Sequence, residues 1–172
     1  ICIISAFYNE EENLENFIKE ISKIKSRLNR SGYLMNLVLI NDGSVDRSAE
    51  IVKKNIKSQK FIRLVNLKKN YGHQIAIYLG LKVFKSDFYG VLDSDCQHDP
   101  NFFIKMLKHL KKNDLDLVQM KKKYGNYENY FKKLLSRIFY FIFSKISNIR
   151  IDPGSSDFYF FNYKLRNKII NS

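Results

Sequence analysis

The stretch Phe88-Tyr89-Gly90-Val91-Leu92-Asp93-Ser94-Asp95 places two carboxylates directly after a short apolar run. The apolar run predicts a buried strand, so the carboxylates fall in the loop that follows it. Two carboxylates one residue apart suit a hard cation such as Mg²⁺ or Mn²⁺, which keeps coordination positions open for phosphate oxygens. Gln97 follows and can add a neutral oxygen ligand. A pair of this kind is also common in solvated acidic loops, so its meaning depends on the rest of the chain.

Outward from this stretch, short apolar runs alternate with amphipathic segments of helical spacing. The runs predict strands at residues 2–4, 37–40, 61–67, 88–92 and 115–120. Helices are expected after Asn9 as a cap, after Ser44 or Asp46 as a cap, at 73–84 and from Pro100 onward. Strands separated by helices predict an α/β fold with a mostly parallel sheet and helices on both faces.

Polar residues collect where three of these strands end. They are Tyr8-Asn9-Glu10, Asn41-Asp42-Gly43 and Asp93-Ser94-Asp95. Ligands of open parallel sheets bind outside the carboxyl ends of the strands, so the three loops are expected to form one site. A carboxylate at Asp42 can accept a hydrogen bond from a base or a ribose, and Gly43 allows a tight turn. The alternative for Asp42 is an ordinary turn or cap aspartate.

Three further positions each have a functional and a structural interpretation. Tyr8 can cover a nucleobase or belong to the core. Asn70-Tyr71-Gly72-His73-Gln74 opens a helix whose N–H groups can face an anion, or it is an ordinary turn. Asp157 can face sugar and acceptor from the lip of a strand, or it is a turn aspartate. The histidines are expected at loop surfaces or caps, and Cys96 as a small buried side chain.

Composition narrows the classes of protein to which the chain can belong. It has 172 residues, enough for one domain, and a net charge of +13 that implies anionic partners such as lipid, nucleic acid or phosphorylated molecules. Its 45% hydrophobic content excludes a disordered chain, and no apolar run is long enough to span a membrane. Neither a GxGxxG nor a GxxxxGK[ST] motif occurs. The two cysteines are expected to be free thiols in a reducing compartment.

The pattern changes after residue 120. Residues 121–126 are expected to form a basic loop, and 127–146 an amphipathic helix with aromatic residues on its apolar side. Such a helix can lie at an anionic membrane surface or cover a core with its basic face in water.

Four motifs in this order resemble the family-two glycosyltransferases of the GT-A fold, and most specifically the polyprenyl-phosphate glycosyltransferases, which include dolichyl-phosphate mannose synthase and bactoprenol glucosyltransferases. The resemblance covers essentially all 172 residues. The motifs that carry it are Tyr8-Asn9-Glu10-Glu11-Glu12-Asn13 (YNEEEN), Asn41-Asp42-Gly43-Ser44-Val45-Asp46 (DDGSxD), Asn70-Tyr71-Gly72-His73-Gln74 (N[FY]GHQ) and Asp93-Ser94-Asp95-Cys96-Gln97 (DADxQ).

The resemblance implies a role for each matching residue. Nucleotide binding falls to Ala6, Tyr8, Glu10, Asp42, Asp93, Ser94 and, beside the diphosphate, Lys122. Asp95 and Gln97 would hold Mg²⁺ or Mn²⁺, which makes Asp95 catalytic. Lys133 and Arg137 would contact the acceptor phosphate, and Asp157 matches the aspartate of the family's GDF segment. The sequence departs from the family at Ala6 (proline), Asn41 (aspartate), Lys122 and Lys133 (arginine) and Tyr159 (arginine).

The function expected from this resemblance is inverting transfer of a sugar from a nucleotide-sugar, most simply a UDP-sugar, to a polyprenyl phosphate in cell-envelope glycan synthesis. The chain would be one catalytic domain, with a nucleotide-binding part at 1–120 and an acceptor-side part at 121–172, truncated at its C-terminus. It would work at the cytoplasmic side of a membrane, anchored by segments beyond this sequence, with no nucleic acid partner. The alternatives are transfer to a glycan hydroxyl, with Asp157 as base, a pseudo-enzyme that keeps the fold, and a non-catalytic nucleic-acid-binding domain.

Overall fold

The computed structural model describes residues 1–121 and 155–171. In chain order the elements are β1 (Cys2–Phe7), α1 (Leu14–Arg30), β2 (Asn36–Asn41), α2 (Ser48–Ser58), β3 (Ile62–Asn66), α3 (His73–Val83), β4 (Phe88–Val91), α4 (Phe102–Lys112), β5 (Leu117–Lys121), β6 (Ser155–Asn162) and α6 (Tyr163–Asn171). One compact unit comprises Ile1–Val118 and Phe158–Ser172, and a second comprises Gln119–Asp157. The expected α/β fold is confirmed.

The strands form a mixed sheet in the order β3-β2-β1-β4-β6-β5. β1 lies parallel to both β2 and β4, β2 lies parallel to β3, and β6 runs antiparallel to β4. Because β1 is flanked by β2 on one side and β4 on the other, the strand order reverses at β1. This reversal point is where open α/β sheets bind ligands.

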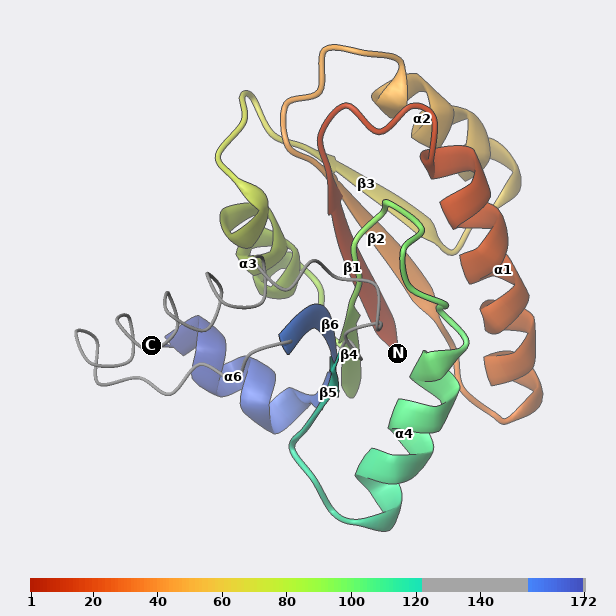
Figure 1. The fold of residues 1–172 in the computed structure, drawn as a ribbon, viewed down its shortest axis with the longest axis vertical. Coiled ribbons are helices and arrows are strands. Elements are labelled where there is room, and N and C mark those ends of the chain that lie inside the picture. The colour runs from red at the N-terminus through yellow and green to blue at the C-terminus, as the bar shows by residue number, and fades with distance from the viewer. Residues whose placement is uncertain (122–154, 172) are drawn as a thin grey trace, which may run out of the picture. The chain divides into compact units, whose positions relative to one another are not determined.

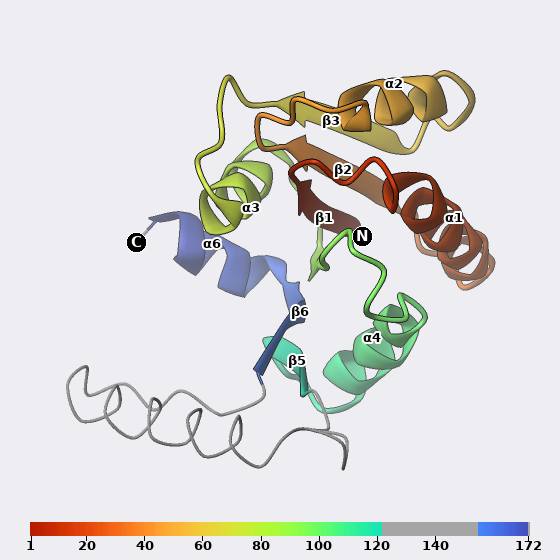
Figure 2. The same ribbon diagram turned by 45° about the horizontal axis from the view of Figure 1, so that its top comes forward.

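Helices cover both faces of the sheet in the first unit (Figures 1 and 2). α1, α2 and α4 lie on one side, and α3 and α6 lie side by side on the other. The core under α3 and α6 includes Ile4 and Ala6 of β1, Val38 of β2, and Ile77 of α3. Ile4 and Ala6 are two residues apart and therefore share one face of the strand, as the two-residue repeat of a strand requires.

The periodicity of α1 gives the correct face of that helix but the wrong cap. Its six apolar positions are all buried: Leu14, Phe17, Ile18, Ile21, Ile24 and Leu28. Asn9 does not cap the helix. It has a φ of 55°, and the backbone turns once more, with the carbonyl of Glu10 accepting the N–H groups of Asn13 and Leu14. Neither of the two caps expected for α2 is its N-cap, which is Arg47; Asp46, one residue earlier, accepts the N–H of Ser48 at 3.0 Å.

The expectations for the two cysteines and for the segment after residue 120 have different outcomes. Both cysteines are free, as expected, but Cys96 is exposed, so its expected burial was wrong. The reason is a left-handed φ of 59° in the loop after β4, which leaves its Sγ near the surface, 3.6 Å from Nδ2 of Asn16. The expected basic loop at 121–126, except Lys121, and the expected helix at 127–146 lie outside the described residues. Within the described segments, no helix has the length and apolar character of a membrane span.

Gly90 of β4 lies directly against Phe103 of α4. A Cβ atom at Gly90 would lie 2.5 Å from Cε1 of Phe103, whose side chain is buried. The Phe103 ring in turn meets Phe158 edge to face, with ring centroids 4.6 Å apart. The position therefore has no room for a methyl group unless this aromatic cluster moves.

We expect Gly90→Ala to lower the free energy of unfolding by about 1–3 kcal/mol, because a methyl group overpacks a close-packed core. Urea unfolding followed by circular dichroism measures the loss. Combining it with Phe103→Leu, which vacates part of the ring's space, should cost less than the sum of the two single changes. Strictly additive losses would show that Gly90 and Phe103 do not press on each other.

Candidate active site

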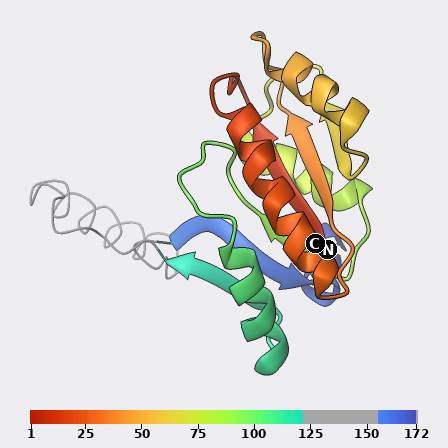
Figure 3. The same ribbon diagram turned by 90° about the vertical axis from the view of Figure 1, so that its right-hand side faces the viewer.

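The loops that follow the parallel strands lie at one end of the sheet (Figure 3). We call them the rim; they are residues 8–13 after β1, 42–47 after β2, 67–72 after β3 and 92–101 after β4. All belong to the first compact unit. Most of the residues predicted to bind nucleotide or metal lie in these loops. The rim is therefore the place where sequence and fold together predict a site.

A buried carboxylate joins the loops after β2 and β3. Asp42 is 3% exposed, and its Oδ1 and Oδ2 accept the backbone N–H groups of Tyr71 at 2.8 Å and Gly72 at 2.9 Å. The sequence suggested that N–H groups at this helix start could face an anion, and the anion they meet is Asp42. Hydrogen bonds of this kind to a charged acceptor are stronger than neutral ones and offset the cost of burying it.

Gly43 allows the backbones of the loops after β2 and β3 to approach each other closely. Its φ is +76°, and a Cβ atom there would lie 2.5 Å from the carbonyl carbon of Lys69 and 2.6 Å from the nitrogen of Asn70. Both neighbours are main-chain atoms, so a side chain at Gly43 would have to displace the loop itself. Asn41 adds two hydrogen bonds, receiving the N–H of Ser44 at 2.8 Å and donating to Asn66 at 3.0 Å.

A second group of contacts joins the loops after β1 and β2. The N–H of Asn9 donates to Ser44 Oγ at 3.0 Å, and Asn9 Oδ1 accepts the N–H of Val45 at 2.9 Å. The N–H of Glu10 donates to Ser48 Oγ at 2.9 Å, and that of Glu11 to Asp46 Oδ2 at 3.1 Å. Residues of the YNEEEN and DDGSxD motifs, together with Ser48, therefore hold the two loops together.

Two carboxylates in this second group have lowered pKa values. The backbone N–H and the guanidinium of Arg47 lower the pKa of Glu11. Burial opposes ionisation of Asp46, but hydrogen bonds from Ser48 and from the N–H of Glu11 lower its pKa overall. Both groups are ionised, and stabilise the loop pair, above their ordinary pKa values. That contribution is lost as the pH falls through the lowered values.

The acidic loop after β4 is tied to β1 and to α3. Ser94 is buried and its hydroxyl donates to the carbonyl of Ala6 at 3.3 Å. Nε2 of His73, the first residue of α3, lies 3.3 Å from Oδ1 of Asp93. His73 was expected only at a surface or cap, so its contact with the acidic pair was missed; its place in the N[FY]GHQ motif was the available signal. Asp95 accepts the N–H of Gln97 at 3.0 Å, which shapes the turn.

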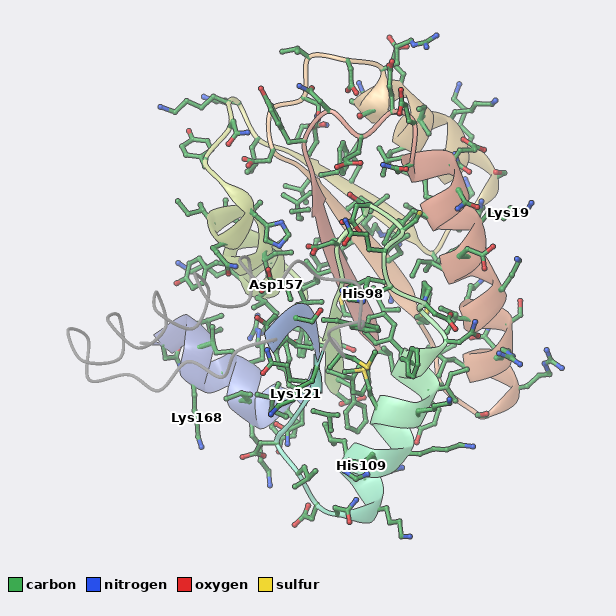
Figure 4. The ribbon with its side chains drawn as sticks, in the orientation of Figure 1. Lys19, His98, His109, Lys121, Asp157 and Lys168 are labelled. Carbon is green, nitrogen blue, oxygen red and sulfur yellow. The ribbon has the colours of Figure 1, made fainter. Side chains whose placement is uncertain are left out.

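The histidines and Tyr8 differ in their surroundings. His98 is partly buried, with its ring centroid 5.6 Å from that of Phe158, whereas His109 lies on α4 (Figure 4). Tyr8 is 45% exposed, which agrees with a half-buried tyrosine and leaves part of its ring open to a ligand. Glu10 is half-buried and holds the side chain of Asn13 at 2.7 Å.

The donors in the loop after β4 fit a hard divalent ion. Within residues 1–121 and 155–171, no three His, Cys, Asp or Glu side chains cluster as a complete metal shell. Mg²⁺ and similar ions are commonly held by one or two carboxylates and complete their shell with water and substrate phosphate. The carboxylate of Asp95 and the amide of Gln97, both at the surface of the rim, supply oxygen donors of that type.

The other predicted site residues are placed as follows. Asp157 is exposed on β6 and belongs to the second compact unit, and its catalytic role stays a prediction. Lys122, Lys133 and Arg137 lie outside the described residues. The nucleotide-binding roles of Ala6, Tyr8, Glu10, Asp42, Asp93 and Ser94 also stay predictions. The structure brings their loops together through the contacts above.

Comparison with known proteins supports this interpretation of the fold and the motifs. A family described as Glycosyl transferase family 2 matches residues 2–171. The chain is 28% identical to the prophage bactoprenol glucosyl transferase homolog of Escherichia coli, covering 92% of this chain and 50% of that protein. It is 29% identical to the dolichol-phosphate mannosyltransferase of Pyrococcus furiosus, covering 80% of this chain and 38% of that protein. The chain spans about half the length of the first curated relatives it matches.

A solved structure shares the fold at low sequence identity. It is a mannosyltransferase from Pyrobaculum calidifontis in complex with GDP-Man and Mn²⁺, with a TM-score of 0.67 and 15% identity. The match covers 98% of this chain and 46% of that one. At this identity the likeness shows the fold alone.

We expect Asp42→Asn to lower the free energy of unfolding by about 1–3 kcal/mol, because an amide NH₂ would then face one of the two N–H donors. Urea unfolding at neutral pH measures the change. Glu12→Gln, which removes a charge from an exposed side chain of the neighbouring loop, is the control and should change stability by less than about 0.5 kcal/mol. Equal effects of the two substitutions would contradict the role of Asp42 as the junction of the loops.

Proposed function

The chain belongs to glycosyl transferase family 2, and from that premise we propose that it transfers a sugar, with inversion at the anomeric carbon, from a nucleotide-sugar to a polyprenyl phosphate. The observation that carries the proposal is the rim. Polar residues after four neighbouring strands are tied by hydrogen bonds into one surface, at the reversal point of the sheet where such folds bind ligands. We propose a UDP-sugar as the donor.

In this proposal different rim residues bind different parts of the nucleotide-sugar donor. The exposed ring of Tyr8 would offer an apolar face to the base, and Glu10 and Asp42 would contact the nucleoside. Asp93 and Ser94 would line the next part of the nucleotide site, toward the diphosphate. Bound to Asp95 and Gln97, Mg²⁺ or Mn²⁺ would offset the charge of the departing diphosphate.

The acceptor decides whether the chain needs a general base. The oxygen of a lipid phosphate is already anionic at about pH 7, because the second ionisation of a phosphate monoester has a pKa near 6. Such a nucleophile needs positioning rather than deprotonation, and Lys133 and Arg137 are the residues we propose for it. A sugar hydroxyl must instead lose its proton during attack, and Asp157 is the proposed base for that alternative.

The names of two relatives support a lipid phosphate as the acceptor class. One is a dolichol-phosphate mannosyltransferase and the other a bactoprenol glucosyl transferase homolog. The net charge of +13 agrees with a membrane that carries anionic lipid and a phosphorylated acceptor. Work at the cytoplasmic face of a membrane in cell-envelope glycan synthesis belongs to the same proposal.

Donor binding can be tested directly by thermal unfolding with UDP-, GDP- and CDP-sugars, each with and without Mn²⁺. One class of donor should raise the melting temperature, because a ligand at about 100 times its Kd stabilises the native state by roughly 2.7 kcal/mol. We expect Asp95→Asn to remove the part of the shift that depends on Mn²⁺. Asp114→Asn, an exposed residue in the turn after α4, should not. No shift with any donor would contradict the proposed function.

The acceptor class can be tested by substitution of the proposed base. We expect Asp157→Asn to leave the rate of transfer to a polyprenyl phosphate nearly unchanged, because that nucleophile is already ionised. Radiolabelled sugar recovered in the lipid phase measures this rate. If the acceptor is a glycan hydroxyl, loss of the base should slow transfer by about 100-fold or more, which would favour the alternative.

A further inference from the structure

An exposed stripe of aromatic and apolar side chains runs along α3. Ile75 and Tyr78 lie three residues apart on one face of the helix and are 48% and 36% exposed, and Tyr71, in the loop just before the helix, is 44% exposed. Val83, at the end of the helix, is 62% exposed. The opposite side of α3 is already used, because Ala76, Ile77 and Leu81 are buried against the sheet. The helix is therefore apolar on both sides, which is unusual for a helix with one side in water.

Lysines accompany the two tyrosines of this stripe. Nζ of Lys69 lies 5.3 Å from the ring centroid of Tyr71, and Nζ of Lys82 lies 5.6 Å from that of Tyr78. A lysine can bury its methylene chain along an apolar surface while its ammonium reaches a polar layer. Tyrosine has the same division, with an apolar ring and a polar tip. All four side chains thus suit a boundary between a hydrocarbon layer and charged groups.

α6 extends the basic surface beside α3. The two helices lie side by side, and Arg166 of α6 fastens them by donating to the carbonyls of Leu81 and Lys82 at the end of α3. Tyr163 is 50% exposed, and Lys164 and Lys168 are exposed on the same helix. Neither helix contains Asp or Glu, and none occurs anywhere between Glu50 and Asp87. We call these exposed residues of both helices the α3–α6 surface.

We propose that the α3–α6 surface binds the headgroup layer of an anionic lipid membrane. The apolar stripe would enter the boundary between headgroups and acyl chains, and the lysines would meet lipid phosphates. Binding of this kind scales with buried apolar area and with attraction to anionic lipid. A nucleic acid would also attract the lysines, but it would leave Ile75 and Val83 without a suitable contact. The combination of the stripe with the charge therefore favours lipid.

The placement of this surface connects it to the rim. α3 begins at His73, whose Nε2 contacts Asp93, and Tyr71 lies just before that residue. A membrane that contacts the stripe would therefore also lie close to the acidic loop after β4. The α3–α6 surface is made of other residues than the helix expected at 127–146, and its existence does not depend on the proposed transfer reaction.

The test is co-sedimentation of the chain with vesicles, without nucleotide or polyprenyl phosphate, so that its outcome is independent of catalysis. We expect binding to phosphatidylcholine vesicles that contain phosphatidylglycerol, and little binding to phosphatidylcholine alone. Lys168→Gln should weaken binding about fivefold, the usual contribution of one lysine at an anionic membrane. Ile75→Ser should weaken it as well, because the stripe loses an apolar side chain that inserts. Both changes are at exposed positions and should leave the melting temperature unchanged.

Lys19→Gln is the matched control. Figure 4 shows Lys19 pointing away from α1 and Lys168 pointing away from α6, on opposite sides of the sheet. The control should bind vesicles as the unmodified chain does. Equal weakening by the two lysine substitutions would show a general charge effect and overturn the proposal. The proposal would also be overturned if Ile75→Ser left binding unchanged, or if Lys168→Gln and Ile75→Ser both bound vesicles as the unmodified chain does. A preference for single-stranded DNA over anionic vesicles would overturn it as well.

Discussion

The buried carboxylate of Asp42 is the constraint on which the rim depends. It lies at the end of β2, almost without contact with water, and its two oxygens hold the N–H groups of Tyr71 and Gly72. An uncompensated charge at this depth would be costly, so the loop after β3 must stay where it is. Because that loop leads directly into α3, Asp42 also fixes where His73 begins the helix and thus where it meets Asp93. Asp42 therefore connects the loops after β2 and β3 directly, and His73, at the start of α3, extends the connection to the loop after β4.

The fourth loop is joined differently, through hydroxyl and carboxylate side chains rather than through a buried charge. Ser44, Asp46 and Ser48 accept N–H groups from the loop after β1, and Arg47 pairs with Glu11. Two of these acceptors, Ser44 and Asp46, belong to the DDGSxD motif. These contacts show that some motif residues act on the loops themselves. Asp42 in particular holds the rim together, whatever it also offers to a ligand.

The sequence alone predicted β1 to β5 and the helices between them, because apolar periodicity and polar loop residues are local signals, but it did not predict α6 or the antiparallel pairing of β6 with β4. The buried face of α1 and the gathering of loops at one edge followed from those signals directly. Contacts between loops could not be derived in this way. The sequence predicts Asn9 as a helix cap, but its side-chain oxygen accepts an N–H from the neighbouring loop. It predicts Cys96 to be buried, but Cys96 is exposed and has a left-handed backbone. Such outcomes depend on which distant N–H or carbonyl lies nearby, and only the folded chain decides that.

The central claim is that these loops form one ligand surface, and paramagnetic broadening by Mn²⁺ tests it most directly. In an amide NMR spectrum of the chain with UDP present, Mn²⁺ bound at the rim should broaden the signals of Gly43, Gly72 and Asp95 together. The signal of Gly32, in the turn after α1, should stay sharp. Broadening confined to the loop after β4, with Gly43 and Gly72 unaffected, would contradict a shared site, as would broadening spread evenly over the acidic residues of the chain.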